Sequence, residues 1–437
     1  MQFKNKKWAF ILFIIFLMTT VAYTVTLLVL PGDMTLLAGQ DYKLSLRSPL
    51  MLQAYTQSDL LEMDDLENGT EAFEMPYALS ARDQGFAELK LKLLGFIPVK
   101  TVKVRSIVSQ QVIACGSPIG IKLKTNGVVV IHVSGVVKDD GTRVSPAESA
   151  GILAGDILLK AGSETLTSIR DLTDAVQKSD GKPVKITYKR NEMTRETDLT
   201  PIKSGEDNQY RLGIWVRDSS AGIGTLTFID PKNSVYGALG HGINDIDTGS
   251  LLQVGSGQLL KSNIRGIKMG QKGTPGELEG EFLDKPDIIG DIEVNSDFGV
   301  FGVLLPDALG ERWGRTLEIG SHSMVHVGKA SILTCIQGQK VEEYEIEIQR
   351  IARTDLSSTK NLVLKITDKR LLDSTGGIVQ GMSGSPILQD GRLIGAVTHV
   401  FINDPTRGYG VFIESMLDKS NNLAKSLGSV SQAASGE

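Results

Sequence analysis

The sequence is short of cysteine and of runs of positive charge, and each shortage excludes a class of protein. The only two cysteines, Cys115 and Cys335, cannot form a disulfide framework or a zinc site made of cysteines. No block of lysine or arginine occurs, and 46 basic against 51 acidic residues give a formal charge of -5, which argues against nucleic-acid binding. The chain has no His-Glu-x-x-His motif, no phosphate loop and no dinucleotide fingerprint, so we expect neither a metal nor a cofactor.

Only one stretch of the chain is long and apolar enough to cross a membrane. Residues 8–30 carry no charge, and three lysines lie within the seven residues before them. As a helix with about 1.5 Å per residue, this stretch would be about 35 Å long and would span a bilayer. The lysines predict that the N-terminus stays in the cytoplasm and that the chain after Pro31 is exported. We therefore expect residues 1–30 to be an uncleaved membrane anchor, with a cleavable signal peptide as the alternative.

Residues 31–108 have the pattern of a connector with short strands. From Asp59 to Glu74 the chain has seven acidic residues and no basic one, with Asn68-Gly69 as a turn. Such a stretch is typical of a solvated segment, and its exposure would make it a site of proteolysis. Residues 89–93 and 99–104 alternate between apolar and polar side chains, as half-buried strands do.

Residues 109–203 have the pattern of a compact unit that contains both strands and helices. It includes a short helix closed by Gly151, a buried strand over residues 157–161, a helix capped by Ser168 and a strand over residues 184–189. The run S-P-A-E-S-A-G-I-L-A-G-D-I-L-L-K-A-G, which ends at Gly162, resembles the bacterial PDZ domain.

The PDZ resemblance implies a peptide-binding groove. Ile119, Gly120 and Ile121 match the loop that binds a carboxylate, and Leu172 lies on the helix that would face this loop. A peptide would then add as a strand between the loop and the helix, and main-chain hydrogen bonds would supply its affinity. The alternative is a packing module that binds no ligand.

The sharpest local motif is a glycine-rich loop with a serine, G-M-S-G-S-P, at residues 381–386. It opens directly into an expected β-hairpin and resembles the nucleophile loop of chymotrypsin-like serine peptidases. The glycines let backbone N–H groups approach a developing oxyanion. The resemblance implies Ser383 as the nucleophile and the N–H groups of Gly381 and Ser383 as the oxyanion hole. Ser385 is the weaker candidate, because it occupies the family's second small position.

Five histidines are available as the base for this serine. His241 stands between Gly240 and Gly242, and such small neighbours would leave its imidazole accessible, as a general base must be. The other four fit less well, since His132 falls in the PDZ-like unit, His322 and His326 alternate as strand residues, and His399 ends the hairpin after the serine.

The carboxylate that would orient His241 is harder to choose. Leu362, Leu364 and Ile366 share one face of an expected strand, and Asp368 ends the same inward row. A carboxylate there would be costly unless hydrogen-bonded, for example to a histidine N–H. Asp373 and Asp245 are the competitors.

Together, the motifs G-A-L-G-H, I-T-D and G-M-S-G-S-P resemble the stage IV sporulation protein B serine peptidases of endospore-forming bacteria. So does the order of N-terminal anchor, PDZ domain and peptidase. The resemblance implies His241 as base, Asp368 as its partner and Ser383 as nucleophile. It also implies a mainly β chain, in which an N-terminal transmembrane helix and an α+β PDZ domain precede a chymotrypsin-like β-barrel serine peptidase at residues 204–437. Asp368 lies 15 residues before Ser383, closer than in ordinary chymotrypsin-like enzymes.

The family resemblance further implies a signalling role in endospore formation. Its members are exported from the forespore into the space between two membranes, where they cleave themselves and a membrane-bound regulator of an intramembrane protease. A late sigma factor is activated as a result. We place the self-cleavage in the acidic stretch, because we expect it to be exposed, and such a cut would release the enzyme from the membrane. The PDZ domain is implied to hold the N-terminal region or the target.

Two other functions fit parts of the sequence. A PDZ-containing membrane adaptor with a degenerate peptidase half would bind proteins without cleaving them, but it would leave the His, Asp and Ser set unexplained. A housekeeping protease of the HtrA type would carry its PDZ domain after the peptidase, whereas here the PDZ-like unit comes first.

Overall fold

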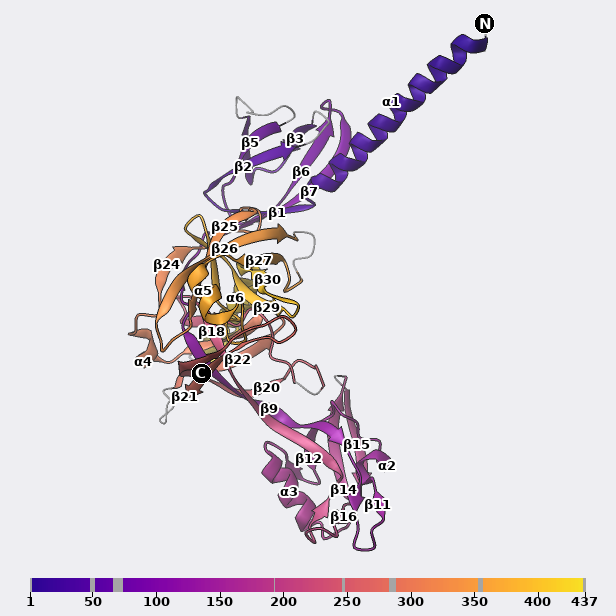
Figure 1. Ribbon diagram of the computed structural model, residues 1–437, viewed down its shortest axis with the longest axis vertical. Helices are drawn as coiled ribbons and strands as arrows, with labels where there is room; N and C mark the ends of the chain where they lie inside the picture. The colour runs from indigo at the N-terminus through magenta and orange to yellow at the C-terminus, as the bar shows by residue number, and fades with distance from the viewer. Residues whose placement is uncertain are drawn as a thin grey trace.

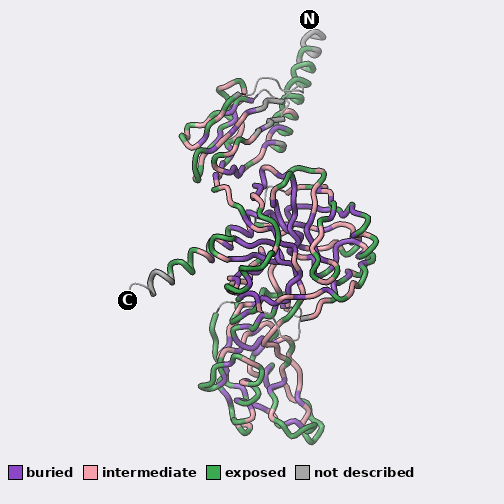
Figure 2. The backbone as a smooth tube through the Cα atoms, turned by 90° about the vertical axis from the view of Figure 1, so that its left-hand side faces the viewer, coloured by how far each residue is buried: buried purple, intermediate pink, exposed green. Residues whose placement is uncertain are grey.

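The computed structural model describes residues 2–47, 52–65, 74–191, 193–245, 248–282, 288–352 and 357–434. Its units follow one another along an elongated molecule, with the N-terminal helix at one end and the PDZ domain at the other (Figure 1). The buried residues gather mainly in the central unit, while the N-terminal helix is exposed (Figure 2). The chain is mainly β, as the sequence predicts.

The N-terminal helix α1 (Gln2–Val29) contains an apolar span, Phe10–Leu28, that is long enough to cross a membrane. Only 6% of this span is buried against the rest of the chain, so the helix is not part of a protein core. The ammonium group of Lys100 donates hydrogen bonds to the carbonyl oxygens of Leu27 and Leu30, where a cation complements the helix dipole. By length and composition, α1 is suited to be a membrane anchor or a signal sequence.

Most of the segment that we interpreted as a connector is folded as two packed sheets. One sheet has the strand order β1 (Asp33–Leu37), β7 (Ile97–Ile107), β6 (Gly85–Leu93), β3 (Leu52–Thr56), and the other β2 (Asp41–Arg47), β5 (Glu74–Ala81), β4 (Leu61–Asp65). Leu36, Leu79 and Leu89 are among the buried residues of their shared core. The connector interpretation was wrong, because alternation shows which residues face inward but not that distant strands supply a common core. The Asn68-Gly69 turn lies outside the described residues.

The central unit is built from two β-barrels. In the first, β9 (Pro118–Val133), β20 (Val254–Lys268), β22 (Ile288–Ser296), β23 (Gly299–Leu304), β19 (Val235–Ala238) and β18 (Ile214–Ile229) pair in this order, and β18 pairs back with β9 to close a ring. Further pairings add β8 (Gln111–Ala114), β24 (Arg315–Glu318) and β21 (Glu277–Phe282), and the short helix α4 (Pro306–Leu309) follows β23. This ring begins before the PDZ domain in sequence, so residues 109–127 belong to the barrel.

The second barrel is closed by β25 (Gly328–Cys335), β26 (Val341–Ile351), β27 (Leu362–Ile366), β30 (Asp404–Phe412), β29 (Arg392–Phe401) and β28 (Pro386–Gln389). Helix α5 (Lys369–Thr375) lies between β27 and β28 in sequence, and helix α6 (Ile413–Ala434) follows β30. The predicted strand at Leu362–Ile366 and the hairpin after residue 386 are confirmed as β27 and as the β28–β29 pair.

The PDZ domain is inserted between two strands of the first barrel. β9 and β18 pair from Pro118 with Thr225 to Val133 with Ile214, so one long ribbon leaves the barrel and carries the domain. The remaining elements are β10 (Val136–Val137), β11 (Arg143–Val144), α2 (Pro146–Ser149), β12 (Ile157–Ala161), β13 (Glu164–Thr165), α3 (Ile169–Lys178), β14 (Val184–Arg190), β15 (Met193–Leu199), β16 (Ile202–Lys203) and β17 (Tyr210–Arg211). The predicted cap of α3 is confirmed, since Ser168 and Asp171 form a reciprocal capping box.

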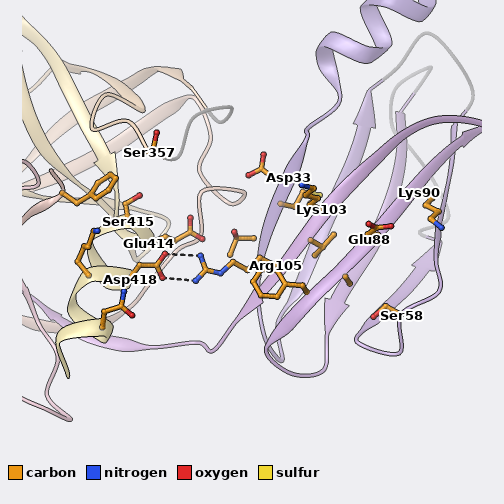
Figure 3. Close-up of a pocket in the computed structure, with 18 of the residues that line it drawn as sticks. Asp33, Ser58, Glu88, Lys90, Lys103, Arg105, Ser357, Glu414, Ser415 and Asp418 are labelled. Carbon is orange, nitrogen blue, oxygen red and sulfur yellow. Dashed lines mark hydrogen bonds and ion pairs between the residues drawn. The ribbon is translucent and has the colours of Figure 1, made fainter. Parts of the chain in front are cut away.

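Polar contacts join the N-terminal unit to the peptidase. The Arg105 guanidinium forms two hydrogen bonds with the Asp418 carboxylate on α6, at 2.9 and 3.1 Å (Figure 3). The Thr35 backbone N–H and the Tyr42 hydroxyl donate to Ser323, in the turn that also holds His322. His322 is fully buried, with its Nδ1 2.7 Å from a Glu414 carboxylate oxygen. Residues 322–324 form a turn, so the interpretation of residues 322–326 as a strand was wrong.

Candidate active site

A cleft of about 900 Å³ lies between the two barrels and holds most of the predicted catalytic residues. It is lined by residues from both barrels, among them Ser220, Ile223, His241, Lys360, Gly381, Ser383 and His399. The structure therefore brings His241 and Ser383 to one cleft, although 142 positions separate them in the sequence (383 − 241).

Strand β18 fixes the loop that carries Ser383. The Thr225 N–H donates to the Ser383 carbonyl oxygen at 3.0 Å, and the Thr225 hydroxyl donates to the Gly381 carbonyl oxygen at 2.7 Å. The Thr227 hydroxyl donates to the Gly384 carbonyl oxygen at 2.8 Å. These bonds hold three carbonyl groups of the loop, at residues 381, 383 and 384, against the first barrel, and the two threonines that donate them are buried there.

The backbone of this loop requires glycine where the sequence places it. Gly381 and Gly384 both have φ +95°, a region that L side chains rarely adopt. A Cβ atom at Gly384 would lie only 2.2 Å from the Thr225 carbonyl oxygen. Within the described part of the chain, the N–H groups of Gly381 and Ser383 donate to no protein acceptor. Two unpaired N–H groups beside a nucleophile are what an oxyanion hole needs.

His241 follows β19 through a sharp turn. Leu239 and Gly240 both have φ +69°, and a left-handed leucine is an uncommon, strained conformation of the kind that clusters at functional sites. Asn295 on β22 then holds the chain after His241. Its amide oxygen accepts from the Ile243 N–H at 2.9 Å, and its amide nitrogen donates to the carbonyl oxygens of Ile243 and Leu252.

The Gly242 carbonyl oxygen determines which nitrogen of His241 carries the proton. His241 Nδ1 lies 2.8 Å from this oxygen, and a carbonyl can only accept, so Nδ1 is the protonated nitrogen. Nε2 is then left with its lone pair, the form in which histidine acts as a base. Burial lowers the His241 pKa below 6.5, and the bond to Gly242 opposes this shift only in part. The imidazole is therefore neutral at pH 7.

The structure does not bring Asp368 to His241. The Asp368 carboxylate accepts hydrogen bonds from the Arg370 backbone N–H at 2.9 Å and from the Arg370 side chain at 2.7 Å, and it caps the N-terminus of α5. The bonds from Arg370 hold the Asp368 pKa below its usual value. The inward row that we predicted for β27 is correct, but α5 begins directly after Asp368 and turns its side chain to the helix end. We correct its assignment as the partner of His241.

The two competing carboxylates are also engaged elsewhere or exposed. Asp245 is buried, with a carboxylate oxygen 2.9 Å from Arg217. Asp373 is exposed on α5. Neither is among the residues that line the cleft.

His399 is a site residue that the sequence did not single out. Its ring centroid lies 5.0 Å from that of His241, and its buried Nδ1 has no hydrogen-bond partner among the described residues. Burial, the nearby His241 and Lys360 lower the His399 pKa to about 4, so this imidazole is neutral at pH 7. The hairpin β28–β29 places it there, because the strand returns past the Ser383 loop and the Gly384 N–H donates to the Val397 carbonyl.

The predicted PDZ loop is not at the surface. Ile119, Gly120 and Ile121 lie in β9, paired with β18 on one edge and with β20 on the other, and all three are buried. Their assignment to peptide binding was wrong, because the short P-I-G-I motif does not reveal that two distant strands flank it. Leu172 is on α3 as expected, where it lines a groove of about 790 Å³. The opposite wall of this groove is the start of β18, from Ile214 to Val216.

Two sequence families match this chain. Residues 208–417 match SpoIVB peptidase S55, and residues 117–200 match a PDZ domain. The peptidase part of the chain, residues 208–417, belongs to the SpoIVB peptidase S55 family, and the chain also has a PDZ domain. This SpoIVB family member is therefore a PDZ-containing serine peptidase, and the alternative of a non-catalytic adaptor is not retained.

A solved structure is also similar to this SpoIVB family member. It is the crystal structure of a thermostable serine protease, AL20, from an extremophilic microorganism. The two share 12% identity with a TM-score of 0.29, over 47% of this chain and 92% of that one. At this TM-score only partial similarity is present, and the double-barrel description of the SpoIVB family member comes from its own strand pairings.

Proposed function

We propose that this chain hydrolyses peptide bonds, with Ser383 as the nucleophile, His241 as the base and the N–H groups of Gly381 and Ser383 as the oxyanion hole. The observation that carries this proposal is that these residues line one cleft. In addition, His241 is protonated on Nδ1, so its Nε2 is free to accept a proton. The Ser383 hydroxyl donates a hydrogen bond to the Thr398 carbonyl oxygen at 2.9 Å. Rotation of this hydroxyl toward His241 lets the imidazole take its proton as the oxygen attacks the substrate carbonyl.

The third member of this machinery is the Gly242 carbonyl oxygen. In a triad, a carboxylate fixes the histidine tautomer and stabilises the imidazolium that forms. The Gly242 carbonyl fixes the tautomer of His241, and its partial negative charge stabilises the imidazolium. Burial leaves His399 neutral beside His241, so it adds no positive charge that would oppose protonation of the base.

The proposed biological role is that of a membrane-tethered signalling peptidase in endospore formation. Helix α1 would anchor it in the forespore membrane, with the bulk of the chain exported to the intermembrane space. Its substrates would be its own N-terminal region and a membrane-bound regulator of an intramembrane protease, whose release activates a late sigma factor. The family assignment and the apolar span of α1 support this role.

The proposed self-cleavage in the acidic stretch has a structural consequence. Its residues 66–73 lie outside the described part of the chain, between β4 and β5. These two strands pair with each other from Leu61 with Ala81 to Asp65 with Tyr77. A cut between them would leave both fragments in one β unit, so release from the membrane would also require this unit to come apart.

The catalytic proposal is tested with two neighbouring serines in the full chain in detergent. Ser383→Ala removes the proposed nucleophile, while Ser385→Ala removes a fully buried hydroxyl that has no hydrogen-bond partner in the described residues. A fluorophosphonate probe should label the wild type and Ser385→Ala but not Ser383→Ala, and self-cleavage should follow the same pattern. Labelling that survives in Ser383→Ala would overturn the assignment. Failure of Ser383→Ala to support spore formation in an endospore-forming host would support the biological role.

A further inference from the structure

Strand β18 has one unpaired edge that runs from the PDZ groove to the active-site cleft. From Ile214 to Ile223 the strand pairs with β9 along one edge, and in the described residues no strand pairs with its other edge. At the groove end this edge faces α3, where Trp215 is 63% exposed. At the other end, residues 220–223 line the catalytic cleft.

The open edge is the continuation of the edge that β19 occupies. β19 pairs antiparallel with β18 from Ile229 to Leu226, and the Leu239 N–H then donates to the Thr225 carbonyl oxygen. The chain leaves the edge in the turn that leads to His241. On this same edge, the Thr225 N–H donates to the Ser383 carbonyl oxygen. The unpaired edge therefore begins beside both proposed catalytic residues.

An extended polypeptide is the occupant that such an edge fits. Unpaired N–H and C=O groups along a strand bind another strand through main-chain hydrogen bonds, with alternate side chains in pockets. The backbone N–H and C=O groups of one strand residue point to the same edge, and those of the next residue point to the other. Both groups of Thr225 point to the β19 edge. The N–H and C=O groups of Ile223 and Ala221, two and four residues earlier, therefore point to the open edge. At the far end, Leu172 and Val176 of α3 provide apolar side chains for the groove.

The geometry points to a substrate that binds as one strand along this edge, with its cleavage site at the barrel end and its carboxyl-side segment in the PDZ groove. This inference rests on the proposed function. An antiparallel strand, oriented like β19, has its N-terminal end near His241 and its C-terminal end near Ile214. Nine residue steps separate Ile214 from Ile223, which is about 30 Å at about 3.3 Å per step. The PDZ domain thus selects a segment roughly nine residues to the carboxyl side of the scissile bond.

The test measures register and polarity by photo-cross-linking. The full chain with Ser383→Ala, in detergent, carries p-benzoylphenylalanine in place of either Trp215 or Ala221, both exposed on β18. The probe is oxidised insulin B chain, and mass spectrometry locates each cross-link on it. We expect position 221 to link to a residue about six places nearer the probe's N-terminus than position 215 does, as the same strand spacing requires. The matched control is the same amino acid at Asp174, exposed on α3 and outside the groove lining.

A second measurement uses cleavage by the active full chain. Thr173 is exposed on α3 and lines the groove, whereas its neighbour Asp174 does not. Thr173→Lys places a longer, charged side chain in the groove, so it should lower kcat/KM for the insulin B chain roughly tenfold, or about 1.4 kcal/mol, whereas Asp174→Lys should not.

Reversed order of the two cross-links, a variable spacing, or equal cross-linking at position 174 would overturn the inference. So would an absence of cross-links to a B chain that the wild type cleaves, and each of these results leaves the proposed catalytic function intact. If the wild type neither cleaves the B chain nor reacts with a fluorophosphonate, the proposed function itself fails.

Discussion

Thr225 offers a sharp test of how the first barrel positions the nucleophile loop on the second. Thr225→Val keeps the side chain at nearly the same volume but removes the hydroxyl that donates to the Gly381 carbonyl oxygen at 2.7 Å. The site is buried, with Thr225 2% exposed, so this carbonyl would lose its partner and gain no water. Leaving a buried acceptor unsatisfied costs about 1–3 kcal/mol.

Loss of this hydrogen bond should lower kcat, because the bond positions the Gly381 carbonyl group. The Gly381 carbonyl belongs to the loop whose N–H groups form the proposed oxyanion hole, and removal of a whole oxyanion donor lowers kcat by about 10²–10³. A loosened loop keeps its donors but places them less well, so we expect kcat to fall by roughly 10–100-fold, with KM little changed.

Thr227→Val is the matched control for this test. Its hydroxyl is equally buried and donates to the Gly384 carbonyl oxygen at 2.8 Å, beyond the oxyanion groups. Both variants should lower the urea midpoint of unfolding by a similar amount, but Thr225→Val should lose more activity against a cleaved peptide. A destabilised Thr225→Val enzyme with wild-type kcat would refute the reasoning.

Three further predictions concern the base, Asp368 and self-cleavage. Protonated His241 cannot accept the Ser383 proton, and burial lowers its pKa below 6.5, so kcat/KM should rise with pH with its midpoint below pH 6.5; a midpoint at or above pH 7 contradicts this. Asp368→Ala removes the cap of α5 and the Arg370 pair, so we expect a loss of about 1–2 kcal/mol in unfolding free energy. Asp368→Asn keeps a capping oxygen and should lose less stability, whereas an inactive Asp368→Asn protein of unchanged stability would contradict our correction of its role. After self-cleavage in residues 66–73, the two fragments should elute together in size-exclusion chromatography until urea is added, and separate elution in native buffer would argue against a cut between the paired strands β4 and β5.

The features that could be predicted from the sequence depend on residues close together in the chain. The capping box at Ser168 lies within four residues, and the hairpin after Ser383 depends on a short turn between two apolar runs. His241 and Ser383 could be chosen because small neighbours surround each of them. These local signals identify what a residue is suited to do, and the structure places both residues in one cleft.

The features that sequence reasoning missed depend on strands that are distant in the chain. Ile119 pairs with Gly224 on one side and Lys261 on the other, and nothing near Ile119 indicates either partner. Asp368 was misplaced because alternation along β27 does not reveal that a helix begins directly after it. The Gly242 carbonyl is a backbone group, so no residue type marks its role.

The insertion of the PDZ domain into a β-ribbon determines how the enzyme can be dissected or engineered. Deletion of residues 109–203 would remove β8 and β9, and with them part of the catalytic barrel. Because Lys124 pairs with Ser219 at the neck of the ribbon, the domain can instead be excised there and replaced by a short hairpin turn. Domains whose two ends lie close together are readily gained at such positions. A peptidase with a plain hairpin in place of the PDZ domain would therefore keep the strands of both barrels.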